Sequence, residues 1–148
     1  MNPPAKFLPN GDTVMVVEFG EEIDLDISRR VTALYAGVNA LELAGITDLV
    51  PTFRSLAIHY DPEIVSFAGL ENTLAKILPD LPIDDFTGRD WSIPACYDLD
   101  LSPALEAVAE ACSLSIEEVI QRHSSDTYHV YMVGFLPGYP YLGDLTAE

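Results

Sequence analysis

The sequence predicts an α+β fold, because segments with the alternation of strands and segments with the apolar spacing of helices follow one another along the chain. Hydrophobic residues make up 49% of the 148 residues, and they occur in periodic groups. This patterning argues against disorder, despite a formal net charge of −17. A domain of this length buries about 70% of the surface that its unfolded chain exposes, so the chain can form a real core.

The first elements expected are a strand and an amphipathic helix. Residues 12–20 form a β-branched run that ends at Gly20, which is typical of a strand. The helix begins with acidic residues from Asp24 onward, carries apolar residues at helical spacing, and stops at Gly45. Two short strands follow, at 49–51 and 55–60, and a hairpin is their simplest arrangement.

A second helix is expected from Asp61-Pro62, which offers a capping residue followed by proline at the first helical position. The segment 90–96 can supply one more strand. The full order is then β-α-β-β-α-β, the order of a ferredoxin-like unit. Residues 80–90, rich in Asp and Pro, are interpreted as a linker, and the domain boundary is placed near residue 88.

Beyond this boundary two short helices are expected. Ser102-Pro103 opens the first, and Ser115 with Glu118 forms a capping box for the second. The two cysteines, Cys96 and Cys112, lack the spacing of a metal site or a disulfide framework. They are predicted to be buried thiols.

The charge excludes nucleic acid as a partner, since phosphate contacts require clustered Lys and Arg. An acidic surface favours solubility, and a partner with a basic face is the alternative. No run reaches the ~18 apolar residues of a membrane span, and the amino terminus lacks an apolar signal core. A cytoplasmic location without membrane contact is therefore expected.

The most distinctive segment is 134–143, which follows a strand-like run over residues 128–133. It holds three glycines, two prolines and three aromatic residues in ten positions. Proline fixes φ and glycine permits positive φ, so this loop is expected to hold one shape and to present its rings as a binding surface. The alternative is that the rings are core residues above a tight turn.

Familiar enzyme signatures are absent from the sequence: it has no phosphate loop, no nucleophile elbow, no HExxH and no GxGxxG. His123 is the best candidate for a general acid or base, because it ends a predicted helix shortly before the aromatic loop. The alternative is a structural role, in which the imidazole complements the helix dipole. With only Lys6 and Lys76 as lysines, the chain is expected to leave any nucleotide phosphate mainly to another chain.

Residues 128–142 resemble the pattern Y-x-V-Y-x-x-G-F-x-P-G-F-P-Y-L of the Kip-inhibitor-like proteins, with Tyr139 where Phe is usual. This family is also called allophanate hydrolase subunit 1 and is identified with the B subunit of ATP-dependent 5-oxoprolinase. His123 matches a recurring H-[ST]-S of the family. Weaker matches along the chain extend the resemblance: Gly11-Asp12, 17–20, Val50-Pro51, Ser55-Leu56, Ile93-Pro94 and Tyr97.

The resemblance implies two domains. Residues 1–88 would form a ferredoxin-like α/β domain. Residues 89–148 would form the first part of a cyclophilin-like β-barrel, which suggests that the chain is truncated at its carboxyl end.

The resemblance also implies a function, the ATP-dependent opening of 5-oxoproline to glutamate together with homologues of the A and C subunits of that enzyme. ATP would be held mainly by a partner subunit, and no metal site is implied. His123 would be the catalytic residue. The residues expected to bind substrate or a partner subunit are Tyr131, Gly134, Phe135, Pro137, Gly138, Tyr139, Pro140 and Tyr141. Two alternatives are a contact inhibitor of a sporulation-type histidine kinase and a subunit of a related allophanate or urea amide hydrolase.

Overall fold

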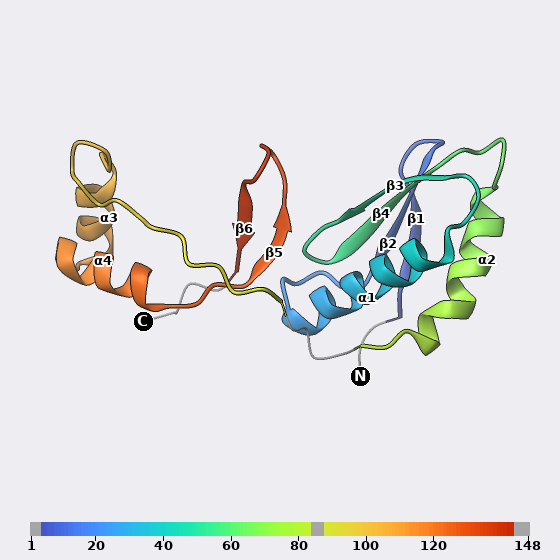
Figure 1. The fold of residues 1–148 in the computed structure, drawn as a ribbon, viewed down its shortest axis with the longest axis horizontal. Helices are drawn as coiled ribbons and strands as arrows, with labels where there is room; N and C mark the ends of the chain where they lie inside the picture. The colour runs from blue at the N-terminus through green and yellow to red at the C-terminus, as the bar shows by residue number, and fades with distance from the viewer. Residues whose placement is uncertain (1–3, 84–87, 144–148) are drawn as a thin grey trace. The chain divides into compact units, whose positions relative to one another are not determined.

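The structure is a computed structural model that describes residues 4–83 and 88–143. The chain divides into two compact units (Figure 1). One unit comprises Met1–Phe86 together with Val130–Glu148, and the other comprises Thr87–His129. The expected domains, 1–88 and 89–148, stay a prediction.

An antiparallel four-stranded sheet forms the centre of the first unit, in the order β1-β2-β4-β3. The chain passes from β2 through α1 to β3 and skips one place in the sheet, and β4 turns back from β3 to fill that place. This is a split βαβ arrangement. The elements are β1 (Lys6–Pro9), β2 (Val14–Glu18), α1 (Leu25–Leu41), β3 (Ile46–Pro51) and β4 (Ser55–Tyr60).

The edge strand beside β2 is β1, at the amino terminus. It pairs with β2 from Lys6↔Glu18 to Pro9↔Met15. Residues 90–96 are not a strand, and the side chains of Trp91 and Ile93 are 74% and 77% exposed. The prediction of a final strand at 90–96 is therefore wrong, because β1 already occupies the edge of β2.

The helix boundaries follow capping chemistry. The acidic start expected at Asp24 is present, and Asp24 is the capping residue of α1: its carboxylate accepts hydrogen bonds from the N–H groups of Asp26 and Ile27 at 2.8 and 3.1 Å. α2 (Phe67–Ile77) begins later than expected, because Ser66 is its cap. Asp61 instead organises a separate turn, in which its carboxylate accepts from the N–H of Glu63. A short 3-10 helix, η1 (Leu78–Asp80), follows α2.

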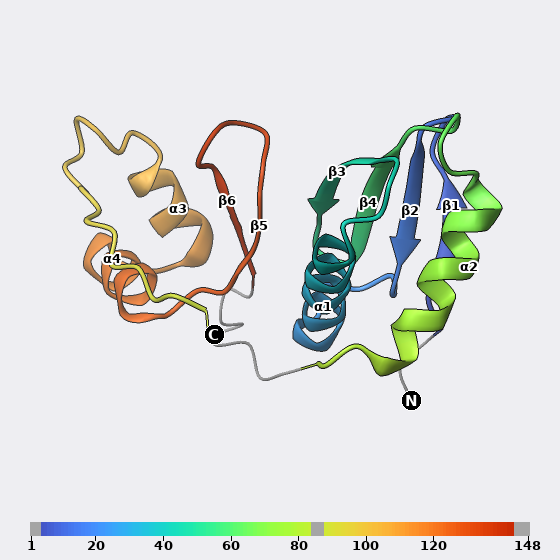
Figure 2. The ribbon, with the colours of Figure 1, turned by 45° about the vertical axis from the view of Figure 1, so that its right-hand side comes forward.

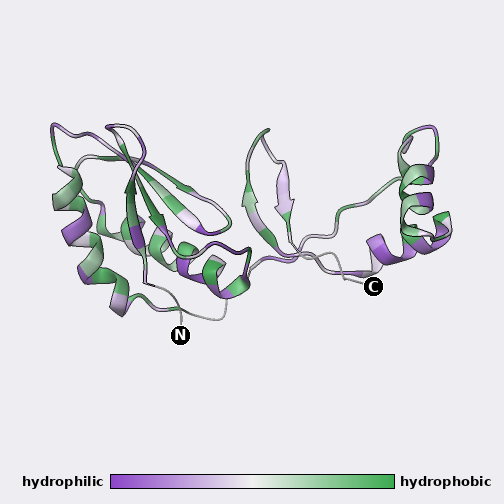
Figure 3. Ribbon diagram, turned by 180° about the vertical axis from the view of Figure 1, so that it is seen from behind, coloured by the Kyte–Doolittle hydropathy of each residue, from purple (hydrophilic) through white to green (hydrophobic). Residues whose placement is uncertain are grey.

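Both helices pack on one face of the sheet (Figure 2). Every second residue of β2 and β4 is buried between the sheet and these helices. Hydrophobic and hydrophilic residues alternate along α2 (Figure 3). Full burial of a Val, Leu, Ile, Phe or Met side chain stabilises the fold by about 1.5–3 kcal/mol. The most deeply buried members are Met15, Val17, Phe19, Val31, Leu34, Leu56, Ile58, Leu70 and Leu74.

The second unit contains two short helices, α3 (Leu105–Cys112) and α4 (Ile116–Ser125). The capping box expected at the start of α4 is present: the Ser115 hydroxyl accepts from the N–H of Glu118, whose carboxylate accepts from the N–H of Ser115 at 2.7 Å. Cys96 and Cys112 are exposed, so the prediction that they are buried is wrong. The buried hydrophobic residues of this unit are Leu105 and Ala109, a core too small to cover both thiols.

The strand expected over 128–133 begins at Val130. β5 (Val130–Val133) and β6 (Pro140–Leu142) pair as an antiparallel hairpin around the aromatic loop. That these strands start a barrel stays a prediction. Across residues 4–83 and 88–143, no helix has the length and apolar character needed to cross a bilayer.

Candidate functional site

The tip of the β5–β6 hairpin is a tight turn. The N–H of Tyr139 donates to the carbonyl of Leu136 at 3.0 Å, with Pro137 and Gly138 between them. Gly138 has a φ of 79°. Proline at the second position and a left-handed glycine at the third are the arrangement of a type II turn. These two residues therefore take the conformations that their chemistry predicts.

Phe135 is held in a left-handed conformation, with a φ of 63°. The N–H of Leu136 donates to the carbonyl of Gly134 at 2.7 Å, which makes Phe135 the centre of a three-residue γ-turn. This conformation costs about 1–2 kcal/mol for a residue with a side chain. The strain does not serve core packing, because Phe135 is 83% exposed.

A row of aromatic rings runs from the interior of the first unit to this loop. Tyr131 is 7% exposed, and its ring centroid lies 5.4 Å from that of Phe53. Phe53 also meets the edge of Tyr141 at 5.8 Å, and Tyr141 lies 5.4 Å from Tyr139. Tyr139 in turn lies 5.9 Å from Phe135. Such pairs add about 0.5–1.5 kcal/mol each beyond burial, so the row supports the loop.

Sequence reasoning missed Phe53, which lies in the connection between β3 and β4. One signal was available, namely a large aromatic residue in a hairpin connection where small polar residues are usual. The rings of this segment differ in burial, and a binding role for the loop stays a prediction. Tyr131 is a core residue, Pro140 and Tyr141 are half-buried, and Phe135 projects into solvent.

The exposed tip of the loop is apolar. Four hydrophobic side chains form what we call the loop-tip patch: Val133, Phe135, Leu136 and Tyr139, which are 60%, 83%, 57% and 48% exposed. Isolated apolar residues are common on protein surfaces, whereas grouped ones mark interaction sites.

His123 lies in the last turn of α4 and is exposed. Its Nδ1 atom is hydrogen-bonded to the hydroxyl of Tyr97 at 2.6 Å, and the two rings meet edge to face at 5.8 Å. The ring of Tyr128 lies 5.9 Å from the imidazole, and its hydroxyl donates to the carbonyl of His123 at 3.1 Å. Among the described residues, Nε2 has no hydrogen-bond partner.

The surroundings of Tyr128 disfavour its phenolate form. Desolvation, and then the nearby Asp126 and Tyr97, raise the pKa of the Tyr128 phenol above its ordinary value. Its hydroxyl therefore remains a hydrogen-bond donor and ties the chain after α4 to the last helical turn.

His123 and the aromatic loop belong to different compact units. They are therefore two candidate sites, each described by itself. Tyr97 was not among the predicted site residues. It lies 26 positions from His123 in the sequence, in a segment without regular structure.

Four of the basic side chains that the structure describes have partners within the chain. Lys6 is paired with two glutamates, and Arg29 lies 2.8 Å from Asp26. Arg30 and Arg54 donate to backbone carbonyls. Phosphate binding needs free clustered cations or glycine-rich backbone N–H groups, and these four side chains are engaged by contacts within the chain. The described residues also contain no cluster of metal ligands.

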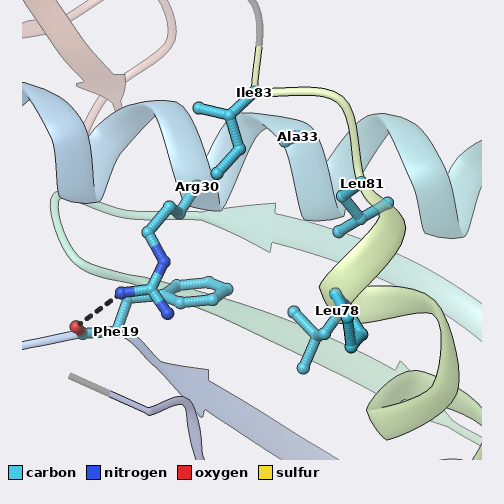
Figure 4. Close-up of a pocket in the computed structure, with 7 residues that line it drawn as sticks. Phe19, Arg30, Ala33, Leu78, Leu81 and Ile83 are labelled. Carbon is cyan, nitrogen blue, oxygen red and sulfur yellow. Dashed lines mark hydrogen bonds between the residues drawn. The ribbon is translucent and has the colours of Figure 1, made fainter. Parts of the chain in front are cut away.

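A hollow of about 220 Å³ lies between α1 and the segment that follows α2 (Figure 4). Arg30 lies over the ring of Phe19 at 4.6 Å and donates to the Phe19 carbonyl at 3.4 Å. Desolvation lowers the pKa of this guanidinium. Arg30 therefore packs against Phe19 and has a structural role in this hollow. The residues that line the hollow include no nucleophile and no acid–base pair. The lining residues are Phe19, Arg30, Ala33, Leu78, Pro79, Leu81 and Ile83.

Comparison with known proteins identifies the family. The model of the family "Carboxyltransferase domain, subdomain C and D" matches residues 5–148. The chain belongs to this family. A crystal structure of the protein TTHA0988 superposes with a TM-score of 0.74 at 31% identity, over 90% of this chain and 26% of that one.

Curated relatives narrow the family further. The chain is 35% identical over 150 residues to the B subunit of 5-oxoprolinase from Bacillus subtilis (strain 168), a match that covers 92% of this chain and 61% of the relative. The protein of the same name from Haemophilus influenzae is 36% identical over 100 residues, with 68% of this chain and 46% of the relative covered. The resemblance to the allophanate hydrolase subunit 1 family is thus confirmed. The chain spans about three fifths of the length of the Bacillus relative.

Proposed function

We propose that this chain is part of the B subunit of an ATP-dependent 5-oxoprolinase, which opens the ring of 5-oxoproline to form glutamate. The observation that carries this proposal is the 35% identity to a 5-oxoprolinase B subunit across 92% of the chain. The chain would act within a complex and not alone. Its proposed partners are homologues of the A and C subunits.

We assign His123 the role of general acid or base in the ring opening. Hydrolysis of the lactam adds water to the carbonyl carbon and breaks the C–N bond, and the nitrogen that leaves must take up a proton. An imidazole that is held through one nitrogen and open at the other can supply that proton or activate the water. His123 meets this requirement, because the residue is exposed and its Nδ1 is hydrogen-bonded to Tyr97.

We assign the loop of residues 134–143 to docking of a partner subunit. The loop-tip patch supports this role over substrate binding, because small-molecule sites are concave, whereas Phe135 projects with 83% of its surface exposed. ATP is assigned to another subunit, since four basic side chains of this chain are already engaged by its own carboxylates and backbone carbonyls.

For the fold, we propose a ferredoxin-like unit in which β1 takes the edge place of a final strand. The split βαβ order and the two helices on one face of the sheet support this reading. We further propose that β5 and β6 begin a cyclophilin-like barrel.

The test is 5-oxoproline-dependent ATP hydrolysis by the reconstituted complex, with this chain extended to the length of its relatives. His123→Ala should lower kcat by about 100-fold or more if the imidazole transfers a proton. Arg122→Ala is the control, because it removes a neighbouring side chain of the same helix turn and leaves the imidazole in place. A His123→Ala complex that assembles and turns over at the wild-type rate would refute the role of His123.

The same reconstitution separates the alternatives. A histidine-kinase inhibitor would bind the dimerisation helices of its kinase and would not stimulate ATP hydrolysis with the A and C subunits. A related amide hydrolase would turn over allophanate instead of 5-oxoproline.

A further inference from the structure

We infer that Tyr97 is a positioning residue for His123, which makes Nε2 the atom of the imidazole that exchanges protons. The inference rests on the proposed function of His123 and extends it to a second residue. Tyr97 is half-buried within residues 91–100, while the other residues of that stretch are exposed. Its hydroxyl lies 2.6 Å from Nδ1 of His123, and this is the hydrogen bond that the imidazole makes among the described residues.

The protonation states of histidine decide the direction of this hydrogen bond in the acid form. Both ring nitrogens of an imidazolium carry protons, so Nδ1–H must donate to the oxygen of Tyr97. When the imidazolium then loses its proton from Nε2, the bond to Tyr97 is retained unchanged. Loss from Nδ1 would instead require the hydroxyl of Tyr97 to turn and become the donor. The proton is therefore transferred most easily at Nε2.

This arrangement specifies the catalytic step. As the C–N bond of the lactam breaks, the proton on Nε2 passes to the nitrogen that leaves, and the imidazole becomes the neutral form with its proton on Nδ1. That form carries its lone pair on Nε2 and can take a proton from the water whose oxygen bonds to the carbonyl carbon of the next lactam, so that the proton lost to the leaving nitrogen is replaced. Throughout the cycle Tyr97 keeps Nδ1 occupied and fixes the orientation of the ring.

The neighbouring tyrosine provides a matched control. The hydroxyl of Tyr128 donates to the backbone carbonyl of His123 at 3.1 Å and makes no hydrogen bond to the imidazole. Both tyrosine rings lie beside the imidazole ring, with centroid-to-centroid distances of 5.8 Å for Tyr97 and 5.9 Å for Tyr128. Tyr128→Phe therefore keeps a ring beside His123 and deletes a hydroxyl, as Tyr97→Phe does, but it leaves Nδ1 bonded.

The first measurement is the tautomer of neutral His123, read from the ring ¹⁵N chemical shifts of the chain labelled at its three histidines. His123→Gln assigns the signals. The wild type should carry its proton mainly on Nδ1, Tyr97→Phe should shift the population toward the Nε2–H tautomer, and Tyr128→Phe should match the wild type. A wild-type imidazole with its proton on Nε2 overturns the inference, even if a variant fails to fold. An unchanged tautomer ratio in folded Tyr97→Phe also overturns it.

The second measurement is turnover by the reconstituted complex. Tyr97→Phe should lower kcat about tenfold with little change in KM, as expected for a residue that orients a catalytic group. The two measurements fail separately. A complex without 5-oxoproline turnover refutes the proposed function and leaves the tautomer result standing, whereas an active complex with an unchanged tautomer refutes the role of Tyr97 alone.

Discussion

Replacement of Gly143 by alanine tests the packing that supports the aromatic loop. A Cβ atom at Gly143 would overlap the ring of Tyr131, at 2.8 Å from Cδ2 and 3.0 Å from Cζ. Carbon atoms pack best at about 3.5–4.0 Å, so the ring must move by more than ~0.7 Å, because its Cε2 atom lies closer still to the added Cβ. Tyr131 has little room to do so, because it is 7% exposed and packs against Phe53.

The expected loss of stability follows from these contacts. Overpacking a core position costs about 1–3 kcal/mol, and displacement of Tyr131 from Phe53 adds part of an aromatic pair, worth ~0.5–1.5 kcal/mol. We therefore expect Gly143→Ala to destabilise the hairpin by about 2 kcal/mol, which is a factor of ~30 in the opening equilibrium.

Hydrogen exchange of the β5 and β6 amides measures this effect locally, and urea unfolding measures it for the whole unit. Gly134→Ala is the matched control in the same hairpin. Its Cβ would lie 3.4 Å from Cε of Met132 and 3.8 Å from Cε2 of Tyr141, which is ordinary contact. We expect a change of about 0.5 kcal/mol or less for this control.

A double substitution isolates the clash. In a Tyr131→Ala background, Gly143→Ala should lose most of its penalty, because the ring that it meets is gone. The reasoning fails if Gly143→Ala and Gly134→Ala accelerate exchange equally, or if the penalty persists without the Tyr131 ring.

Two further predictions concern the loop-tip patch and α4. Phe135→Ala should lower the stability of the chain by no more than the ~0.5–1.5 kcal/mol of its ring pair with Tyr139. It should weaken binding to the partner subunits at least ~10-fold, because exposed aromatic residues at interfaces carry much of the affinity. Calorimetry measures the binding, with Leu8→Ala, another exposed apolar residue, as the control, and equal losses of affinity in the two variants would contradict the prediction. Ser115→Ala should destabilise α4 by about 1 kcal/mol, measured by hydrogen exchange. Hydrogen bonds from Ser115 lower the pKa of Glu118, so this stabilisation is present above the ordinary carboxyl pKa and lost as the pH falls through the lowered one. Protection of α4 should decrease on acidification in the wild type, and a Glu118→Gln variant with the same decrease would exclude this cause.

Local chemistry made part of this structure predictable. The acidic start at Asp24 and the capping box at Ser115 mark the beginnings of their helices, and Pro137 with Gly138 forms a tight turn in the loop that was expected to hold one shape. Capping and turn conformations depend on residues within about four positions of one another, so the sequence contains the necessary information. The motif around the loop was likewise enough to recognise the family, which the matched relatives confirm.

Predictions failed where distant partners decide the outcome. β1 is a strand because β2 offers it an edge, and its four residues, which end at Pro9, carry too little alternation to indicate a strand. Residues 90–96 have a strand-like composition but no strand of the described sheet beside them. The pattern of a segment states what it can form, whereas pairing decides what it does form.

The candidate sites were also predictable only in part from the sequence. The sequence by itself identified His123 and the aromatic loop, because both stand out by residue type and spacing. Only the tertiary structure showed that Tyr97 holds the imidazole and that Phe53 supports the loop rings. It also showed that Phe135 is strained and exposed. These contacts join residues far apart in the chain, and such neighbours are set by folding of the whole unit and not by local preference.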